Sequence, residues 1–346
     1  MAIIAPDIGI DLGTSNTLVH VRGRGIQINE PTLCIMTGGD RRTVKAIGQD
    51  ALALAGRTTG GDVAVRPLAD GTVKDFDLTE SVLRYFLRKA IGVSHLVKPR
   101  LYITVPSRIS PVERRVIREA AASAGVRKNA IHLIDKPFAA AYGSGLPVFQ
   151  PEGSMVVDIG GGTTEVSVIA LGGTVLSKSI PVAGIRMDAV IVEFIKHDHN
   201  MLIGDRMAED IKIDWGSALP VSEERKVVVR GRDLITGLPQ TAEISSNRFQ
   251  EALHNPCVAI LSAIREVLDK TPPELCGDIL RKGIFLVGGG AQLYSLDRFL
   301  AGELGLPVTL ARDPMLCAAA GVGYMAENAE ILPKLTRGNF LRDDKA

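Results

Sequence analysis

The stretch "MVVDIGGGTTEVSV", residues 155–168, decides the fold, because it places an acid, Asp158, directly against three glycines and two threonines. Glycine-rich turns beside hydroxyl groups usually hold phosphate through backbone N–H groups, and a carboxylate there would repel it. A second stretch, "IGIDLGTSNTLVHV" (residues 8–21), repeats the design around Asp11. Apolar residues alternate on both sides of each turn, which predicts two β-hairpins.

The pattern that follows each hairpin repeats as well. Asp11 and Asp158 lie 158 − 11 = 147 positions apart, and in both halves a strand, a helix, a second strand and a second helix are predicted after the hairpin. Each half has its own hydrophobic strands. The repeat therefore predicts an α/β fold with two duplicated lobes that face each other across a cleft.

Two helices carry particular signals. Ser110 and Glu113 are spaced as a capping box at the start of a helix that Gly125 ends. A long amphipathic helix is predicted at 247–270, and Pro256 is expected to break it.

Length and composition limit the class of protein. At 346 residues the chain is long enough for about two domains, and its net charge of only +1 indicates no nucleic-acid partner. The cysteines are far apart, which is typical of free thiols in a reducing cytosol and not of a metal site or a disulfide framework. No apolar run approaches the roughly 18 residues of a membrane span, and "MAIIAP" is too short for a signal peptide. We expect a cytoplasmic protein, which can still touch a membrane surface.

A carboxylate near phosphate is tolerable if a divalent cation lies between them. Mg²⁺ prefers a few carboxylates together with water and phosphate oxygens. Asp11 and Asp158, one from each half, are therefore predicted to hold Mg²⁺ directly or through its water. The residues predicted to hold phosphate are Gly13, Thr14, Ser15 and Asn16 on the first turn and Gly160, Gly161, Gly162, Thr163 and Thr164 on the second.

A single Asp-x-Gly turn is more often structural than functional, because both residues are favoured in turns for backbone reasons. Two copies in corresponding positions favour a nucleotide. A third motif, "VGGGAQL", adds glycines at 288, 289 and 290 that let a base or ribose approach the backbone. Gly288, Gly289 and Gly290 are therefore predicted to line a nucleotide.

Together these motifs resemble the actin-like ATPases, and the whole chain resembles the MreB family of bacterial cell-shape filament proteins. Segments specific to that family include "VRPLADGTVKDF", "VPSRISPVERRVIREAA", "IGDRMAEDIKIDWGSA" and "DPMLCAAAGVG". The resemblance implies an actin-like ATPase fold, with two smaller inserted subdomains around a central nucleotide cleft. Its first lobe would span 1–145, with a small subdomain at about 31–65, and be completed by about 314–346. The second lobe would span 146–313, with a small subdomain at about 182–243.

The resemblance also implies roles for individual residues. ATP or ADP with Mg²⁺ would be the ligand, and Thr163 would belong to the catalytic group with Asp11 and Asp158. Residues that would reach the ribose and base are Glu209, Asp210, Ile211 and Lys212, and those that would line the adenosine side are Gly289, Gly290, Ala291 and Gln292. Without the family, Glu209 and Lys212 would be taken as an exposed ion pair one helical turn apart.

The chain departs from the family in "LIDKPFAAAYG". MreB proteins typically carry two acids before this proline, and the second orients or activates the attacking water. Here Asp135 keeps the first acid, and Lys136 occupies the catalytic place. A lysine cannot act as a base unless its pKa falls by several units, but it can pair with phosphate. We predict tight ATP binding with slow hydrolysis; Asp135 acting in place of the missing acid is the alternative.

The resemblance implies self-assembly into head-to-tail protofilaments that pair on the inner face of the cell membrane. Such a filament would work with cell-elongation and wall-synthesis proteins to organise rod shape. Leu96 and Val97, followed by Lys98 and Arg100, match an apolar tip with basic anchors for lipid. Packing of both apolar residues under the loop is the alternative. A specialised paralogue that positions an organelle or plasmid, and a small-molecule kinase of the same fold, are the alternative functions.

Overall fold

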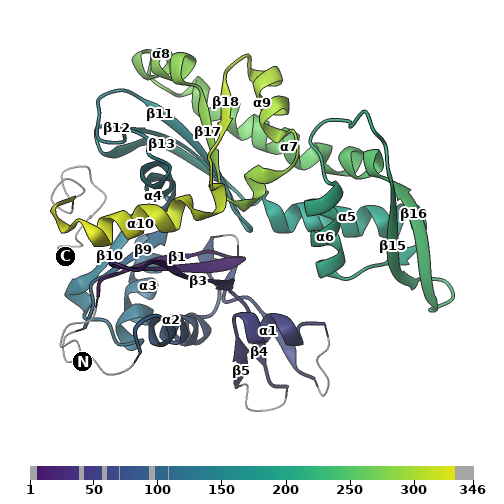
Figure 1. Cartoon of the computed structure of the whole chain (residues 1–346), viewed down its shortest axis with the longest axis horizontal. Helices are drawn as coiled ribbons and strands as arrows, with labels where there is room; N and C mark the ends of the chain where they lie inside the picture. Colours follow the sequence, from purple (N-terminus) through teal and green to yellow (C-terminus); the bar gives the residue numbers. More distant parts are fainter. Residues whose placement is uncertain are drawn as a thin grey trace.

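The computed structural model describes residues 6–38, 43–56, 61–69, 71–92, 98–107 and 109–331. Two five-stranded sheets form its frame (Figure 1). The strands of the first sheet are β1 (Ile8–Leu12), β2 (Asn16–Val21), β3 (Gly25–Pro31), β9 (Leu101–Val105) and β10 (Ile131–Asp135). The strands of the second are β11 (Ser154–Ile159), β12 (Thr164–Ala170), β13 (Gly173–Ile180), β17 (Ile284–Val287) and β18 (Val308–Leu310).

The two sheets have the same topology. Written so that corresponding strands stand in the same place, the strand orders are β10-β9-β1-β2-β3 and β18-β17-β11-β12-β13. In each sheet the central strand, β1 or β11, pairs antiparallel with its hairpin partner and parallel with a strand from later in the chain. Even the hairpin turns are closed alike: Gly13 N–H donates to Asn16 O over 3.1 Å, and Gly160 N–H donates to Thr163 O over 2.9 Å. The predicted hairpins and the duplication are confirmed.

Two helices lie between the sheets, α4 (Lys136–Gly143) and α10 (Cys317–Glu327) (Figure 1). Their residues form one buried cluster with Tyr102 of the first sheet and with Val156 and Val287 of the second. The two helices cross with their backbones in contact, because a Cβ added at Gly321 would lie only 2.6 Å from the carbonyl carbon of Ala139. Glycine is needed where two backbones approach this closely.

Further helices cover the outer faces. On the first sheet these are α2 (Phe76–Ile91) and α3 (Pro111–Ser123), and on the second they are α7 (Ser246–Asp269), α8 (Pro273–Lys282) and α9 (Leu296–Leu304). The predicted capping box is confirmed: Ser110 accepts from the backbone N–H of Glu113 over 3.2 Å, and the Glu113 carboxylate accepts from the N–H of Ser110 over 2.9 Å.

The predicted break at Pro256 is wrong, because α7 continues through it. A proline inside a helix removes one hydrogen bond and costs about 3 kcal/mol. Leu253 and Ile260, one turn before and one turn after the proline, are both fully buried in the core of the second half. Burying such side chains contributes about 1.5–3 kcal/mol each, so packing on both sides outweighs the lost bond.

Two small subdomains project from the sheets at one end of the molecule (Figure 1). The first contains β4 (Cys34–Met36), β5 (Val44–Ile47), β6 (Val63–Val65) and α1 (Gln49–Leu54), and the short strands β7 (Leu68–Ala69) and β8 (Thr72–Val73) follow it. The second contains β14 (Met201–Leu202), β15 (Lys226–Asp233), β16 (Pro239–Ser245), α5 (Gly184–His199) and α6 (Asp205–Trp215).

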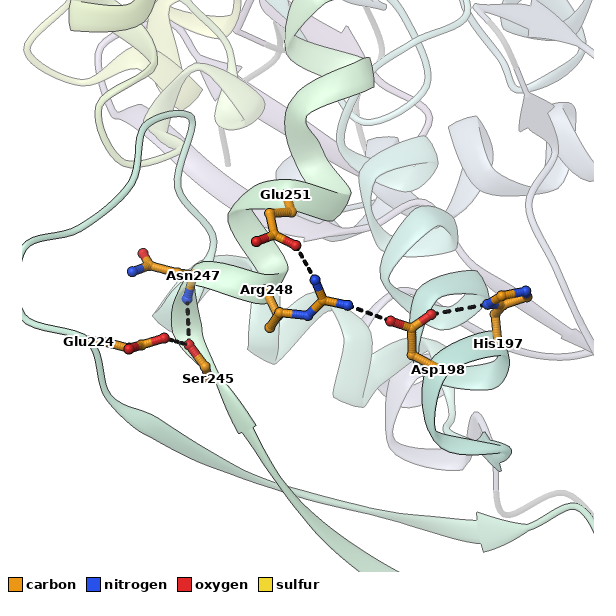
Figure 2. A network of polar contacts seen from close by, with 7 residues as sticks. All are labelled: His197, Asp198, Glu224, Ser245, Asn247, Arg248 and Glu251. Carbon is orange, nitrogen blue, oxygen red and sulfur yellow. Dashed lines mark hydrogen bonds and ion pairs between the residues drawn. The ribbon is translucent and has the colours of Figure 1, made fainter.

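Arg248 ties the second small subdomain to the long helix α7, as Figure 2 shows. Its guanidinium donates to Asp198 Oδ2, near the end of α5, over 2.6 Å and also contacts Glu251. The same group lies 5.4 Å from the ring centre of Phe194. Ser245, the N-cap of α7, accepts from the N–H of Asn247 over 3.2 Å. The first turn of α7 is therefore bound to α5 through Arg248 and capped by Ser245.

In the part of the chain that the structure describes, none of the helices combines the length and the apolar character needed to cross a bilayer.

Candidate functional site

The two predicted acids lie at corresponding positions of the two sheets. Asp11 is near the end of β1 and Asp158 near the end of β11, and both are almost fully buried, with 4% and 3% of their surface exposed. One side chain joins them: Lys136 Nζ lies 3.7 Å from Asp11 Oδ1 and 3.8 Å from Asp158 Oδ2. The hydroxyl of Thr104, on β9, donates to Asp11 Oδ1 over 2.6 Å. The two carboxylates therefore share one ammonium between the sheets.

The two glycine turns meet each other directly. A Cβ added at Gly161 would overlap the Ser15 side chain, and one added at Gly162 would lie 2.7 Å from the Thr14 hydroxyl. Asn16, at the other end of the first turn, donates from Nδ2 to Asn29 Oδ1 over 3.0 Å. The glycines therefore let the hydroxyl-bearing turn of the first half approach the backbone of the second.

The third glycine motif packs on the second turn. A Cβ at Gly288 would overlap the Asp158 carboxylate, and one at Gly290 would lie 2.6 Å from Ile159 and 3.2 Å from the carbonyl oxygen of Gly160. Gly288 also has a φ of 85°, a conformation that side-chain-bearing residues rarely adopt. Residues 288–290 therefore lie beside Asp158.

Burial and neighbouring charges shift the pKa values of Lys136 and Asp158. Burial alone would lower the pKa of Lys136, but the carboxylates of Asp11 and Asp158 raise it above its ordinary value. Burial raises the pKa of Asp158, and the Lys136 ammonium partly offsets that rise. Lys136 is therefore protonated at neutral pH.

Asp135, the neighbouring acid, is engaged elsewhere. Its carboxylate forms an ion pair with Arg114 on α3 over 3.1 Å. Burial raises the pKa of Asp135 to about 6, although Arg114 opposes the rise. The backbone therefore directs two successive side chains apart, Asp135 to α3 and Lys136 to the acid pair.

A buried glutamate that the sequence analysis missed links the two halves. Glu165, on β12, accepts hydrogen bonds on Oε2 from the backbone N–H of Ser107 over 3.1 Å and from its hydroxyl over 3.0 Å. Ser107 follows β9 of the first half and also contacts the Ser177 hydroxyl on β13 over 2.5 Å. Burial raises the pKa of Glu165 to about 7, against the Ser107 backbone hydrogen bond. The sequence contains a signal for Glu165, because pairing across the second hairpin places this residue directly opposite Asp158.

Arg66 was also missed, although it lies in the quoted "VRPLADGTVKDF". Its Nη1 donates to the carbonyl oxygens of Thr14 and Ser15, each over 3.1 Å. Burial lowers the pKa of Arg66, and nearby Glu209 and Asp188 partly offset this. Arg66 therefore binds the first glycine turn and feels the charge of acids in the second small subdomain.

Lys212 borders the second turn. Its Nζ lies 2.7 Å from Asp188 Oδ1, on α5, and donates to the carbonyl oxygen of Gly184 over 3.3 Å. The backbone N–H of Gly184 in turn donates to Gly160 O over 3.1 Å. The expected alternative, an ion pair between Glu209 and Lys212, is replaced by the pair with Asp188.

The side chains of several other residues predicted to bind the nucleotide point away from the acid pair or make contacts elsewhere. Thr164 is fully buried, and its hydroxyl donates to Val182 O over 2.6 Å. Ile211 is packed in the core of the second half, and Ala291 is buried there too. Gln292 is exposed and donates to Gly289 O over 3.4 Å, and Asp210 is exposed on α6. For Thr164, Ile211 and Ala291, only backbone groups remain for a ligand.

Thr163 faces the first half: a Cβ at Gly71, which follows β7, would lie 3.3 Å from its Cγ2 and 3.7 Å from its hydroxyl. The proposed membrane tip, Leu96 and Val97, lies outside the described residues.

Comparison with known proteins gives consistent results. The family model described as MreB/Mbl protein matches residues 5–334. The chain is 46% identical to the cell shape-determining protein Mbl of Bacillus cereus over 334 residues, which cover 96% of this chain and 99% of that protein. It is also 46% identical to the cell shape-determining protein MreB of Escherichia coli over 325 residues, 93% of each chain.

Solved structures agree. MreB5 of Spiroplasma citri bound to AMPPNP matches with a TM-score of 0.89 and 33% identity, over 96% of this chain and 98% of that one. The MamK double helical filament matches with a TM-score of 0.76 and 22% identity, over 93% and 98% of the two chains, a likeness of fold.

Proposed function

Because this chain belongs to the MreB/Mbl family of actin-like proteins, we propose that it binds ATP or ADP and polymerises into cytoskeletal filaments. The observation that supports this best is the contact between the two duplicated turns, each preceded by a buried acid. Structures of the 33% identical MreB5 of Spiroplasma citri bound to AMPPNP and to ADP support a nucleotide as the ligand.

In this proposal the phosphates bind at the turns of residues 13–16 and 160–163, through backbone N–H groups and the hydroxyls of Thr14, Ser15 and Thr163. Ribose and base lie toward Glu209, Lys212 and the glycines of 288–290. Mg²⁺ is part of the proposal as an ion carried by the phosphates. We also keep the expected lobes, 1–145 with 314–346 and 146–313, as a proposal.

The proposed filament is a head-to-tail protofilament, paired with a second one, on the inner face of the cell membrane. Its work is to organise cell-wall synthesis and rod shape together with cell-elongation proteins. Relatives named cell shape-determining proteins, aligned over nearly the whole chain, support this role. Leu96 and Val97 stay the proposed lipid contact.

Hydrolysis is proposed to be slow, because Lys136 stands at the place of the usual catalytic acid. Its pKa is raised by Asp11 and Asp158, so it holds its proton at neutral pH and cannot accept one from water. Asp135 could act as a base only after leaving its ion pair with Arg114. We therefore expect ATP to be retained and turned over rarely.

Phosphate release from ATP tests this part in the wild type and in Lys136→Glu. The variant restores an acid at this place and should release phosphate at least about tenfold faster, since general base catalysis contributes about 10²–10⁴-fold. A wild type that already turns over briskly, with the variant no faster, contradicts the proposal.

Pelleting and electron microscopy with ATP, with and without lipid vesicles, test the filament itself. A filament protein sediments in a nucleotide-dependent way. A small-molecule kinase of the same fold would stay in the supernatant, and that result would reject the polymer. Filaments that form but ignore lipid would favour the specialised paralogue.

A further inference from the structure

The position of the Lys136 ammonium has a consequence beyond hydrolysis. Lys136 is the first residue of α4 and follows β10 of the first sheet. Its Nζ lies 3.7 Å and 3.8 Å from the nearest oxygens of Asp11 and Asp158. A Cβ added at Gly160 would lie 3.8 Å from the same nitrogen. The ammonium therefore occupies the space between both acids and beside the second glycine turn.

This is the space that the sequence predicts for Mg²⁺. Mg²⁺ demands near-octahedral oxygen coordination at about 2.0–2.1 Å. An ion held directly by both carboxylates would need the position that the ammonium takes. A magnesium ion chelated by Asp11 and Asp158 therefore does not fit the residues present.

The ammonium meets the electrostatic need that a metal would otherwise meet. Two buried carboxylates close together are costly unless a cation pairs with them. Lys136 supplies that cation from within the chain, and the Thr104 hydroxyl adds a hydrogen bond to Asp11. A lysine ammonium has three donors, so one more can point to a phosphate oxygen while two face the acids.

We infer that Lys136 is a built-in cation that replaces the divalent ion at the acid pair, so that nucleotide binding by this chain depends little on Mg²⁺. The inference rests on the proposed nucleotide binding. Thermodynamic linkage makes it measurable, because a metal that strengthens nucleotide binding does so by a coupling factor, usually about 5–150-fold. For the wild type the factor should be below about fivefold, and for Lys136→Gln above about tenfold.

The experiment measures the Kd of a fluorescent ATP analogue, with unlabelled ATP as competitor, in excess Mg²⁺ and in EDTA. Wild type, Lys136→Gln and Lys136→Arg are compared. The arginine variant keeps the charge and should keep the weak magnesium dependence. Lys178→Gln is the matched control: it removes a lysine that pairs with Glu266 on α7, away from the acid pair, and should behave as wild type.

A second readout needs no nucleotide. Without its ammonium the acid pair of Lys136→Gln repels itself, so Mg²⁺ alone should raise the Tm of this variant and leave that of the wild type unchanged. If the variant fails to fold, the magnesium dependence of the wild type alone decides the question.

A wild type whose affinity in EDTA falls by more than about fivefold overturns the inference. So does Lys136→Gln with the same magnesium dependence as wild type. If no protein binds nucleotide with or without Mg²⁺, the proposed function fails instead, and the two failures are therefore distinguishable.

Discussion

The crossing of α4 and α10 between the sheets makes Gly321→Ala a decisive substitution. A Cβ there would lie 2.6 Å from the carbonyl carbon and 3.0 Å from the Cα of Ala139, whereas carbon atoms in good contact lie about 3.5–4.0 Å apart. The opposing atoms are backbone, so no side-chain rotation relieves the overlap. The two helices must move apart by about 1 Å, in a cluster that also contains residues of both sheets.

Two effects of opposite sign set the size of the change. Alanine favours a helix over glycine by about 1 kcal/mol. Overpacking costs about 1–3 kcal/mol, occasionally more, and rigid backbone on both sides puts Gly321 at the upper end. We expect a net loss of about 2 kcal/mol. At about 2.1 cal/mol/K of unfolding entropy per residue, the 346 residues give a fall in Tm of about 3 °C.

Thermal unfolding followed by circular dichroism measures this, with Gly277→Ala as the control. Gly277 lies in α8, where an added Cβ meets nothing within 4 Å, so only the helix effect remains and Tm should rise by about 1 °C. The test is that Tm changes in opposite directions in the two variants, falling in Gly321→Ala and rising in Gly277→Ala. A Gly321→Ala variant as stable as Gly277→Ala would refute the close crossing.

Three further substitutions test separate features. Burial raises the pKa of Glu165 from 4.5 to about 7, so the native state keeps a proton that the unfolded chain releases, and stability falls as pH rises through this window. Glu165→Gln should therefore gain up to about 3 kcal/mol over wild type between pH 4.5 and pH 8 in urea denaturation; a gain independent of pH contradicts this. Ser110→Ala should lose about 1 kcal/mol with its capping box, and an unchanged urea midpoint would show that the cap contributes little. Arg66→Ala removes both hydrogen bonds to the carbonyl oxygens of the first turn, so ATP affinity should fall about tenfold; full affinity in a binding titration would exclude Arg66 as a positioning residue.

Strong local signals predicted the elements around the site. The hairpins alternate apolar residues on buried strands, and Ser110 with Glu113 encodes its cap in four consecutive positions. Some short or half-exposed strands were missed. β3 exposes Gln27 and Asn29 to solvent, and β4 and β6 have three residues each, so their periodicity is too short to stand out.

Side-chain direction was the other limit. Thr164 and Ile211 belong to stretches that reach the site, but the pleat of β12 turns the Thr164 hydroxyl to Val182, and the turn of α6 buries Ile211. Arg66 reaches the first glycine turn from 52 positions away in the chain. Such a contact is set by tertiary packing, and no local pattern contains it.

Lys136 shows what the geometry adds to a substitution read in sequence. In the sequence alone, Lys136 replaces the residue that would act as a base, and the expected consequence is slow hydrolysis. From the structure it is also a cation held between two acids of opposite sheets, and the expected consequence is a changed metal requirement. The two consequences separate in Lys136→Gln, which has neither base nor cation: hydrolysis should stay slow while magnesium dependence appears. Lys136 also begins α4, whose other end, at Gly143, lies against the backbone of Cys317 in α10, so a single helix runs from the acid pair to the helix crossing between the sheets.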